Sequence, residues 1–173
     1  MGYAGGSTKN PTYRNLADHT ETIQVDFDPE VTSYEDLLLF FFAGHDPFGV
    51  SFSRQYKSII FAHDAEQERV AREAKAQLEA RTGRTVVTEI VAAWDFYPAE
   101  DYHQKYALQG NAALMREFQA IYPNFTDIVN STAAARVNGF LYGCGSPADV
   151  RELQDQLGLS QDAIARLLKG LGG

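Results

Sequence analysis

The chain contains a single cysteine, Cys144, which lies between two glycines in the segment from Tyr142 to Ser146. A thiol in a flexible, accessible segment is what disulfide exchange requires, because the attacking thiolate must reach the other sulfur atom. The sequence also fits a second interpretation, a small buried side chain, since free cysteine is among the most buried residue types. One cysteine excludes an internal disulfide and favours a reducing compartment, so we expect a cytoplasmic protein.

Carboxylates and a histidine lie close together between Ala99 and Tyr106, a composition that can bind a metal ion. The four histidines and the one cysteine show neither a His-x-x-x-His nor a Cys-x-x-Cys spacing. The sequence therefore predicts no metal site, and no cofactor is expected. We expect instead that Asp101 and His103 form a supporting shell that locks a loop around a pocket, with Glu89 as a neighbour.

Three segments occur in a fixed order, with Glu21 between the second and the third: Met1-Gly2-Tyr3-Ala4-Gly5-Gly6, Asn10-Pro11-Thr12-Tyr13, and Phe96-Tyr97-Pro98-Ala99-Glu100-Asp101-Tyr102-His103-Gln104-Lys105-Tyr106. In this order they resemble the A type of peptide methionine sulfoxide reductase, the MsrA family. The last of the three is the most specific. The resemblance implies an oxidoreductase that acts on sulfur.

The reaction that the resemblance implies is reduction of the S-epimer of methionine sulfoxide, in oxidised proteins or as the free amino acid. In the family, a cysteine thiolate attacks the sulfoxide sulfur, a carboxylic acid protonates the departing oxygen, and tyrosine hydroxyls hold that oxygen. A second cysteine then forms a disulfide with the resulting sulfenic acid, and thioredoxin or a similar dithiol restores both thiols. A carboxyl group stays protonated near neutral pH when burial disfavours its charged form.

By this resemblance Glu21 is the acid, and Tyr13 and Tyr56 are the tyrosines that hold the oxygen. Without the resemblance, Glu21 fits a solvated glutamate at the end of a strand, because glutamate is rarely buried. Tyr13 fits a ring at the edge of a core equally well, and the turn from Asn10 to Thr12 would present it in either case.

The resemblance also assigns roles to the glycines and to the cysteine. Gly5 and Gly6 are expected to permit close approach of the backbone and to shape the pocket wall. Cys144 is expected to be the resolving cysteine. The aspartate that helps to fix a water molecule in the family has no match here, since Asp46 aligns with the His-Asp-Pro turn.

Members of the family carry the nucleophilic cysteine in a Gly-Cys-Phe-Trp-Gly segment, which these 173 residues do not contain. We therefore expect an N-terminally truncated reductase that is inactive as given, in which the missing strand leaves a sheet edge or apolar slot open. Two alternatives stay open at this point. One is a non-catalytic protein that binds methionine sulfoxide, and the other is a reductase that uses Cys144 as its nucleophile.

The hydrophobic pattern predicts strands and helices in alternation over the first half of the chain. Strands are expected over Thr22 to Phe27, Lys57 to Ala62 and Thr85 to Trp94. Helices are expected from the N-cap Ser33 to Ala43, largely buried, and from Asp64 to Arg81, with Gly83 after its end. This order predicts the α+β class: a two-layer sandwich with a mixed β-sheet, ferredoxin-like as in the MsrA family.

The C-terminal part of the chain is predicted to be helical. A short helix is expected over Asn111 to Ile121, and a helical hairpin over 146–173 has Ser146 and Ser160 at the starts of its helices. We predict an MsrA-like catalytic domain over 1–125, a glycine-bearing linker over 126–145, and the hairpin as an appendage. The hairpin is expected to serve packing or partner contact rather than DNA reading, because its second helix has few basic residues.

The overall charge limits the partners. Lys plus Arg number 15 and Asp plus Glu number 23, which gives a net charge of −8. An acidic balance disfavours binding to a phosphate backbone, so no nucleic-acid partner is expected. The apolar run from Leu37 to Ala43 is far too short to span a bilayer, so no membrane partner is expected.

Overall fold

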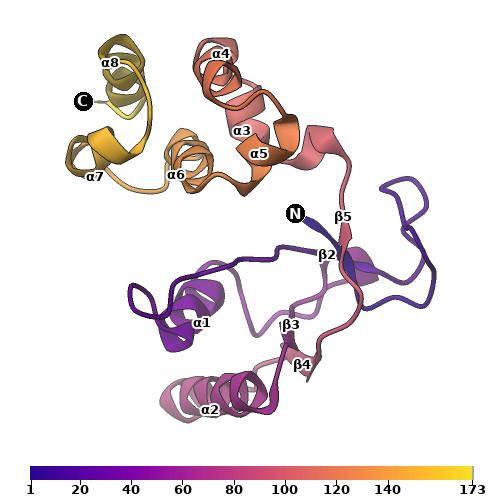
Figure 1. Ribbon diagram of the computed structural model, residues 1–173. Helices are drawn as coiled ribbons and strands as arrows, with labels where there is room; N and C mark the ends of the chain where they lie inside the picture. The colour runs from indigo at the N-terminus through magenta and orange to yellow at the C-terminus, as the bar shows by residue number, and fades with distance from the viewer. Residues whose placement is uncertain (173) are drawn as a thin grey trace. The chain divides into compact units, whose positions relative to one another are not determined.

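The computed structural model describes residues 1–172, which divide into two compact units. Unit 1 spans Met1–Glu100, and unit 2 begins at Asp101. Unit 1 combines short strands with two α-helices, and unit 2 is built from helices (Figure 1). The predicted α+β class is confirmed.

Unit 1 carries its strands in two ladders. Its elements are, in chain order, β1 (Gly2–Ala4), β2 (Thr20–Thr22), α1 (Tyr34–Ala43), the 3-10 turn η1 (Arg54–Tyr56), β3 (Ile59–Ala62), α2 (Ala65–Thr82), β4 (Glu89–Ala92) and β5 (Tyr97–Pro98). β1 is the middle strand of the antiparallel ladder β2-β1-β5, and β3 pairs with β4 in parallel. In register, Tyr3 of β1 lies opposite Glu21 of β2 and Tyr97 of β5.

The strand predicted over Thr22 to Phe27 is wrong in its extent. The observed strand β2 ends at Thr22, and the side chains of Ile23 and Val25 are 73% and 54% exposed. Alternation of apolar and polar residues favours a strand, but a strand also needs a neighbour that pairs with its backbone N–H and C=O groups. Within the described residues, β2 pairs with β1 only as far as Thr22.

Helix α1 begins where the sequence predicts, but it is less buried than expected. Ser33 accepts a hydrogen bond from the backbone N–H of Asp36, and the side chain of Asp36 accepts one in return from Ser33. Leu38 is buried, whereas Leu39 and Phe40 are 63% and 76% exposed. Apolar residues run around the whole helix, and contact on one side can bury only one stripe of them.

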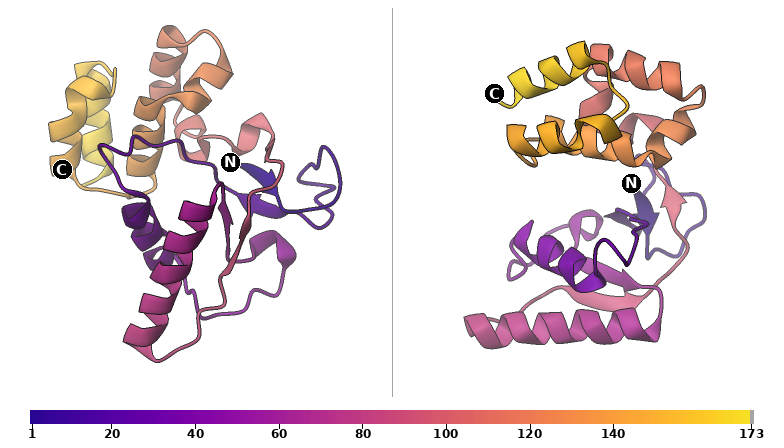
Figure 2. Two further views of the ribbon diagram at one scale, coloured as in Figure 1. Left: turned by 60° about the horizontal axis from the view of Figure 1, so that its bottom comes forward. Right: turned by 60° about the vertical axis from the view of Figure 1, so that its left-hand side comes forward.

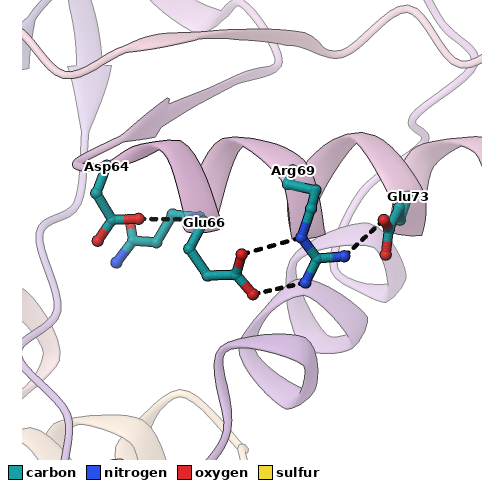
Figure 3. Close-up of polar contacts among 5 residues, drawn as sticks. Asp64, Glu66, Arg69 and Glu73 are labelled. Carbon is teal, nitrogen blue, oxygen red and sulfur yellow. Dashed lines mark hydrogen bonds and ion pairs between the residues drawn. The ribbon is translucent and has the colours of Figure 1, made fainter.

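Helix α2 matches its prediction at both ends. Asp64 accepts a hydrogen bond from the N–H of Gln67, and Gly83 ends the helix in the left-handed conformation with φ of 66°. On its exposed face Arg69 bridges Glu66 and Glu73 (Figure 3), with a distance of 2.6 Å from Nη1 to Glu73 Oε1. The hydrogen bonds and charges of the two glutamates raise the pKa of Arg69, and the hydrogen bond with Glu66 is the largest cause.

The core of unit 1 lies between the two helices and the parallel ladder. Val70 and Ala71 of α2 pack with Leu38 of α1, Ile60 of β3 and Ile90 of β4. The strand predicted over Lys57 to Ala62 is confirmed, with β3 forming most of it.

The strand predicted over Thr85 to Trp94 is shorter than expected, because its first residues pair elsewhere. Val87 N–H donates to the carbonyl oxygen of Pro47 at 2.9 Å, and Lys75 Nζ donates to that of Thr88 at 2.8 Å. Only β4, Glu89–Ala92, remains in the ladder with β3.

Unit 2 encloses one apolar core. Its elements are η2 (Asp101–His103), α3 (Tyr106–Gln109), α4 (Ala112–Ile121), α5 (Phe125–Asn130), α6 (Thr132–Leu141), α7 (Pro147–Leu153), η3 (Gln154–Gln156) and α8 (Gln161–Gly170). Residues from α3 to α8 share the core, with Phe118 of α4 and Val137 of α6 fully buried. The segment 126–145, predicted as a linker, holds most of α5 and all of α6, because its apolar residues complete this core.

The predicted helical hairpin is confirmed as α7 and α8, which Figures 1 and 2 show as the last two α-helices of the chain. Ser146 caps α7 in a reciprocal pair with Asp149. Ser160 caps α8 and also donates to Glu117 of α4, with 2.6 Å between Ser160 Oγ and Glu117 Oε1. Local caps therefore set the start of each helix, and two hydrogen bonds from Ser160 to Glu117 join the start of α8 to α4.

Candidate functional site

Glu21 lies in β2 and is half-buried. Its Oε1 atom accepts a hydrogen bond from the side-chain amide of Gln55, with 2.6 Å between Gln55 Nε2 and Glu21 Oε1. The sequence did not single out Gln55, which is 34 positions away along the chain. The carboxyl group of this partly buried residue is therefore held at one oxygen by a neutral donor.

The turn η1 brings Gln55 to this position. Thr20 Oγ1 donates to the carbonyl oxygen of Arg54 at 3.0 Å, and Ser53 Oγ accepts from the backbone N–H of Gln55 at 3.2 Å. Two consecutive residues of β2, Thr20 and Glu21, thus bond two consecutive residues of η1. This double link fixes the turn, and with it Tyr56, beside the strand.

Tyr56 follows Gln55 directly, and its side chain is 61% exposed. The negative charge of Glu21 is the main cause that raises the pKa of Tyr56, followed by partial desolvation and by the charge and hydrogen bonding of Tyr13. A raised pKa keeps the phenol protonated, and therefore able to donate a hydrogen bond, to a higher pH. Glu21, Tyr13 and Tyr56, which the sequence proposed as one site, are brought together in the structure.

Glu100 positions Tyr13, and the sequence interpretation missed it. Glu100 Oε1 accepts from the backbone N–H of Tyr13 at 3.0 Å, and Glu100 Oε2 accepts from the hydroxyl of the fully buried Tyr3 at 2.7 Å. Glu100 lies within the motif-bearing run from Phe96 to Tyr106, but the prediction gave the supporting role to Asp101 and His103. The position of Glu100 in this run was the sequence feature that could have identified it as a site residue.

Gly6 allows the glycine-rich turn to lie against His19. A Cβ atom at Gly6 would be 2.3 Å from a ring carbon of His19, which is buried at 1% exposure. The Gly6 N–H donates to His19 Nδ1 at 3.2 Å, so Nε2 carries the proton and donates to the carbonyl oxygen of Thr8 at 2.8 Å. Gly5 has φ of 78°, where a side chain would be strained.

Asp18 also holds the glycine-rich turn, through the residue that follows Gly6. Its Oδ1 atom accepts from the backbone N–H of Ser7 at 2.9 Å. This bond is the main cause that lowers the pKa of Asp18. His19 and Asp18 directly precede β2, so the turn is tied to the strand that carries Glu21.

Local contacts are seen for the residues of the predicted supporting shell. Asp101 and His103 form η2 at the start of unit 2, where the Asp101 carbonyl accepts from Gln109 Nε2 at 2.7 Å and the His103 ring packs on Tyr102. Glu89 begins β4 and forms an ion pair with Lys57. The supporting role of these three residues stays a prediction.

Cys144 lies between α6 and α7 in unit 2, and it is exposed. Its backbone N–H donates to the carbonyl oxygen of Gly139 at 2.9 Å. Gly143 and Gly145 have φ of 80° and 92°, values that favour glycine. The alternative interpretation of Cys144 as a small buried residue is therefore wrong.

Neither of two shallow hollows includes the acid or the tyrosines. One, of about 400 Å³, lies between α2 and β4, and the other, of about 370 Å³, lies between α4 and α8. Over residues 1–172, no three His, Cys, Asp or Glu side chains gather as a metal site would need. Within the same residues, no helix has both the length and the apolar composition needed to cross a membrane.

Comparison with known proteins identifies the family. A family model described as peptide methionine sulfoxide reductase matches residues 1–134. The chain belongs to this family. The resemblance stated from the sequence motifs is thereby confirmed.

The matches to two relatives extend beyond residues 1–134, the region that the family model covers. The chain is 40% identical over 163 residues to a peptide methionine sulfoxide reductase of Drosophila melanogaster, and this match covers 92% of the chain and 65% of the relative. It is 36% identical over 172 residues to peptide methionine sulfoxide reductase A5 of Oryza sativa subsp. japonica, covering 96% of the chain and 65% of the relative. The chain thus spans about 65% of the length of each, and both matches extend over most of unit 2.

The fold is similar to a solved structure. The crystal structure of Mxr1 from Saccharomyces cerevisiae in its reduced form matches with a TM-score of 0.59 and 31% sequence identity. The match covers 64% of this chain and 68% of Mxr1.

Proposed function

We propose that this chain is the acid-bearing part of a peptide-methionine (S)-S-oxide reductase, with Glu21 as the acid and Tyr13 and Tyr56 as the groups that hold the sulfoxide oxygen. The observation that carries the proposal is the convergence of these three side chains, in which the charge of Glu21 is the main cause of the raised pKa of Tyr56. Family membership supplies the reaction class.

In the proposed reaction, a cysteine thiolate attacks the sulfur of methionine sulfoxide, and Glu21 transfers a proton to the sulfoxide oxygen. The S–O bond of the substrate breaks and an S–O bond forms at the cysteine sulfur, which takes the protonated oxygen, so the products are methionine and a cysteine sulfenic acid. Methionine sulfoxide is reduced and the cysteine is oxidised. The attacking thiol is assigned to a cysteine other than Cys144.

Cys144 is proposed as the resolving cysteine, which condenses with the sulfenic acid to a disulfide and releases water. Its exposure and the two flanking glycines support this role, since thiol exchange needs an accessible and adaptable thiol. Thioredoxin or a similar dithiol would then reduce the disulfide. This recycling fits a reducing compartment such as the cytoplasm.

Binding of the two sulfoxide epimers tests the site. Isothermal titration of the chain with N-acetyl-methionine-S-sulfoxide methylamide should show saturable binding, weaker for the R-epimer and weakened at least tenfold by joint replacement of Tyr13 and Tyr56 with phenylalanine. Tyr142→Phe is a matched control, because Tyr142 is exposed at the C-terminal end of α6. Equal binding of both epimers, or no binding, would contradict the proposal.

Two further measurements separate the alternatives. Turnover of the S-epimer by this chain under dithiothreitol, abolished by Cys144→Ser, would show that Cys144 is the nucleophile. An intact mass from the natural source above the 19.2 kDa of this chain, with a second cysteine, would support the reductase. A mass of 19.2 kDa, with binding but no turnover, would indicate a methionine-sulfoxide-binding protein instead.

A further inference from the structure

We propose that Gln55 is a positioning residue that holds Glu21 Oε1, so that Oε2 is the oxygen that carries and delivers the proton. The inference rests on the proposed function of Glu21 as an acid. The bond from Gln55 Nε2 to Glu21 Oε1 measures 2.6 Å, a short contact, slightly below the range of about 2.7–3.2 Å usual for N–H···O hydrogen bonds.

The chemistry of the amide determines which oxygen is protonated. The Nε2 atom of glutamine only donates hydrogen bonds. If the carboxyl proton were on Oε1, it would face an amide hydrogen, and the bond would be replaced by repulsion between two donors. With Oε1 accepting from Gln55, the proton is placed on Oε2, which the proposal assigns to meet the sulfoxide. The reaction then moves one proton from Oε2 to the sulfoxide oxygen, and Glu21 is left as a carboxylate.

Gln55 is itself held firmly enough to perform this role. Its backbone N–H bonds Ser53 Oγ at 3.2 Å, and the carbonyl before it, that of Arg54, accepts from Thr20 Oγ1 at 3.0 Å. The side chain is half-buried, which limits competition from water for the amide. A positioning group of this kind orients a reacting atom without touching the substrate.

The pKa of Tyr56 reports the position of Glu21, so it can test the inference without any substrate. NMR titration of 13Cζ-labelled tyrosine, with the Tyr56 signal assigned from a Tyr56→Phe spectrum, should give the highest Tyr56 pKa in the wild type. Glu21→Gln removes the charge that contributes most to the raised pKa of Tyr56, so it should lower that pKa toward its ordinary value. Gln55→Leu should lower it by part of that amount, because the carboxylate loses its donor and moves.

The double variant separates an effect through Glu21 from a direct effect on the neighbouring tyrosine. In the Glu21→Gln background, Gln55→Leu should cause no further change in the pKa of Tyr56. Gln67→Leu is the matched control, because Gln67 bonds the backbone N–H of His63 at 3.1 Å at the start of α2. An unchanged Tyr56 pKa in Gln55→Leu, or an equal drop in both backgrounds, would overturn the inference.

Sulfoxide binding distinguishes failure of this inference from failure of the proposed function. Gln55→Leu should weaken binding of the S-sulfoxide by roughly three- to tenfold, while Gln67→Leu should not. Wild-type affinity in Gln55→Leu would overturn the inference and leave the proposed function standing. If the wild type binds no sulfoxide but the pKa coupling through Glu21 is present, Gln55 still holds the Glu21 carboxyl, while the proposed function fails and with it the delivery of the proton.

Discussion

Unit 1 and unit 2 hold their structures in different ways. In unit 2, helices α3 to α8 enclose one continuous apolar core in which Phe118 and Val137 are fully buried. Unit 1 has a smaller core around Val70 and Ala71, and large apolar side chains such as Phe40 remain exposed. The groups proposed for chemistry in unit 1 are instead held by long-range polar bonds.

This difference teaches where each unit is sensitive to substitution. A continuous core responds most to loss of volume, because an apolar cavity leaves its lining without contacts. A site held by hydrogen bonds responds most to loss of a single donor or acceptor, because a half-buried partner is then unsatisfied. The following substitutions test this contrast, from the largest expected effect to the smallest.

Phe118→Ala should destabilise unit 2 by ~3–5 kcal/mol, because it removes a fully buried ring from the centre of the core. Urea denaturation followed by hydrogen exchange of unit 2 amides measures the change. Phe40→Ala is the matched control in unit 1, and it should change stability by less than ~0.5 kcal/mol because Phe40 is 76% exposed. A similar cost for both would contradict the contrast.

Gly6→Ala should destabilise the β1–β2 region by ~1–3 kcal/mol, because the new methyl group would overlap the His19 ring. Faster hydrogen exchange of the β1 and β2 amides measures this effect. Gly170→Ala is the control, since a Cβ there has no heavy atom within 4 Å and should be neutral or stabilising. Unchanged exchange in Gly6→Ala would mean that the His19 ring moves freely aside.

Glu100→Gln should cost ~1–2 kcal/mol, because it replaces a charged acceptor of two hydrogen bonds with a neutral amide. We expect faster hydrogen exchange at the Tyr13 amide and weaker sulfoxide binding. Glu30→Gln, at an exposed position, is the matched control. If hydrogen exchange at the Tyr13 amide is the same in Glu100→Gln as in the wild type, Glu100 does not hold Tyr13 in the site.

Glu117→Gln should make unit 2 less stable at neutral pH, with a difference that shrinks in acid. Hydrogen bonds from Ser160 lower the pKa of Glu117 below its usual 4.5. A lowered pKa contributes stability above the unfolded value, and that contribution is lost as the pH falls through the folded value. Denaturation from pH 7 to pH 3 tests the sign, with Glu152→Gln as control, and a difference that grows in acid would contradict it.

Arg69→Ala should change stability by less than ~1 kcal/mol, although Arg69 bonds both Glu66 and Glu73 (Figure 3). Exposed ion pairs are screened by water and salt, and alanine favours the helix. Thermal denaturation of the wild type and the variant at low and high salt measures the change in stability. A loss of stability above ~2 kcal/mol would show that the exposed ion pairs stabilise unit 1 far more than expected.

Several helices, such as α1, α2 and α8, could be predicted closely, whereas α5, α6 and the extent of two of the predicted strands could not. Ser33, Asp64 and Ser160 each cap a helix by bonding a residue three positions later, so the signal is local. The extent of β2 depends on pairing with β1, which no pattern within the strand itself reveals. The boundary between the units depends likewise on which distant apolar residues share a core.

By itself, the sequence determined the family, the limits of several helices and the identity of Glu21, Tyr13 and Tyr56 as candidates, because motifs and caps depend on neighbouring residues. Only the tertiary structure decided what holds them. Gln55 meets Glu21 across 34 positions, and Glu100 meets Tyr13 across 87. Such bonds arise when strands and turns pack together, so their partners follow from the fold rather than from spacing along the chain.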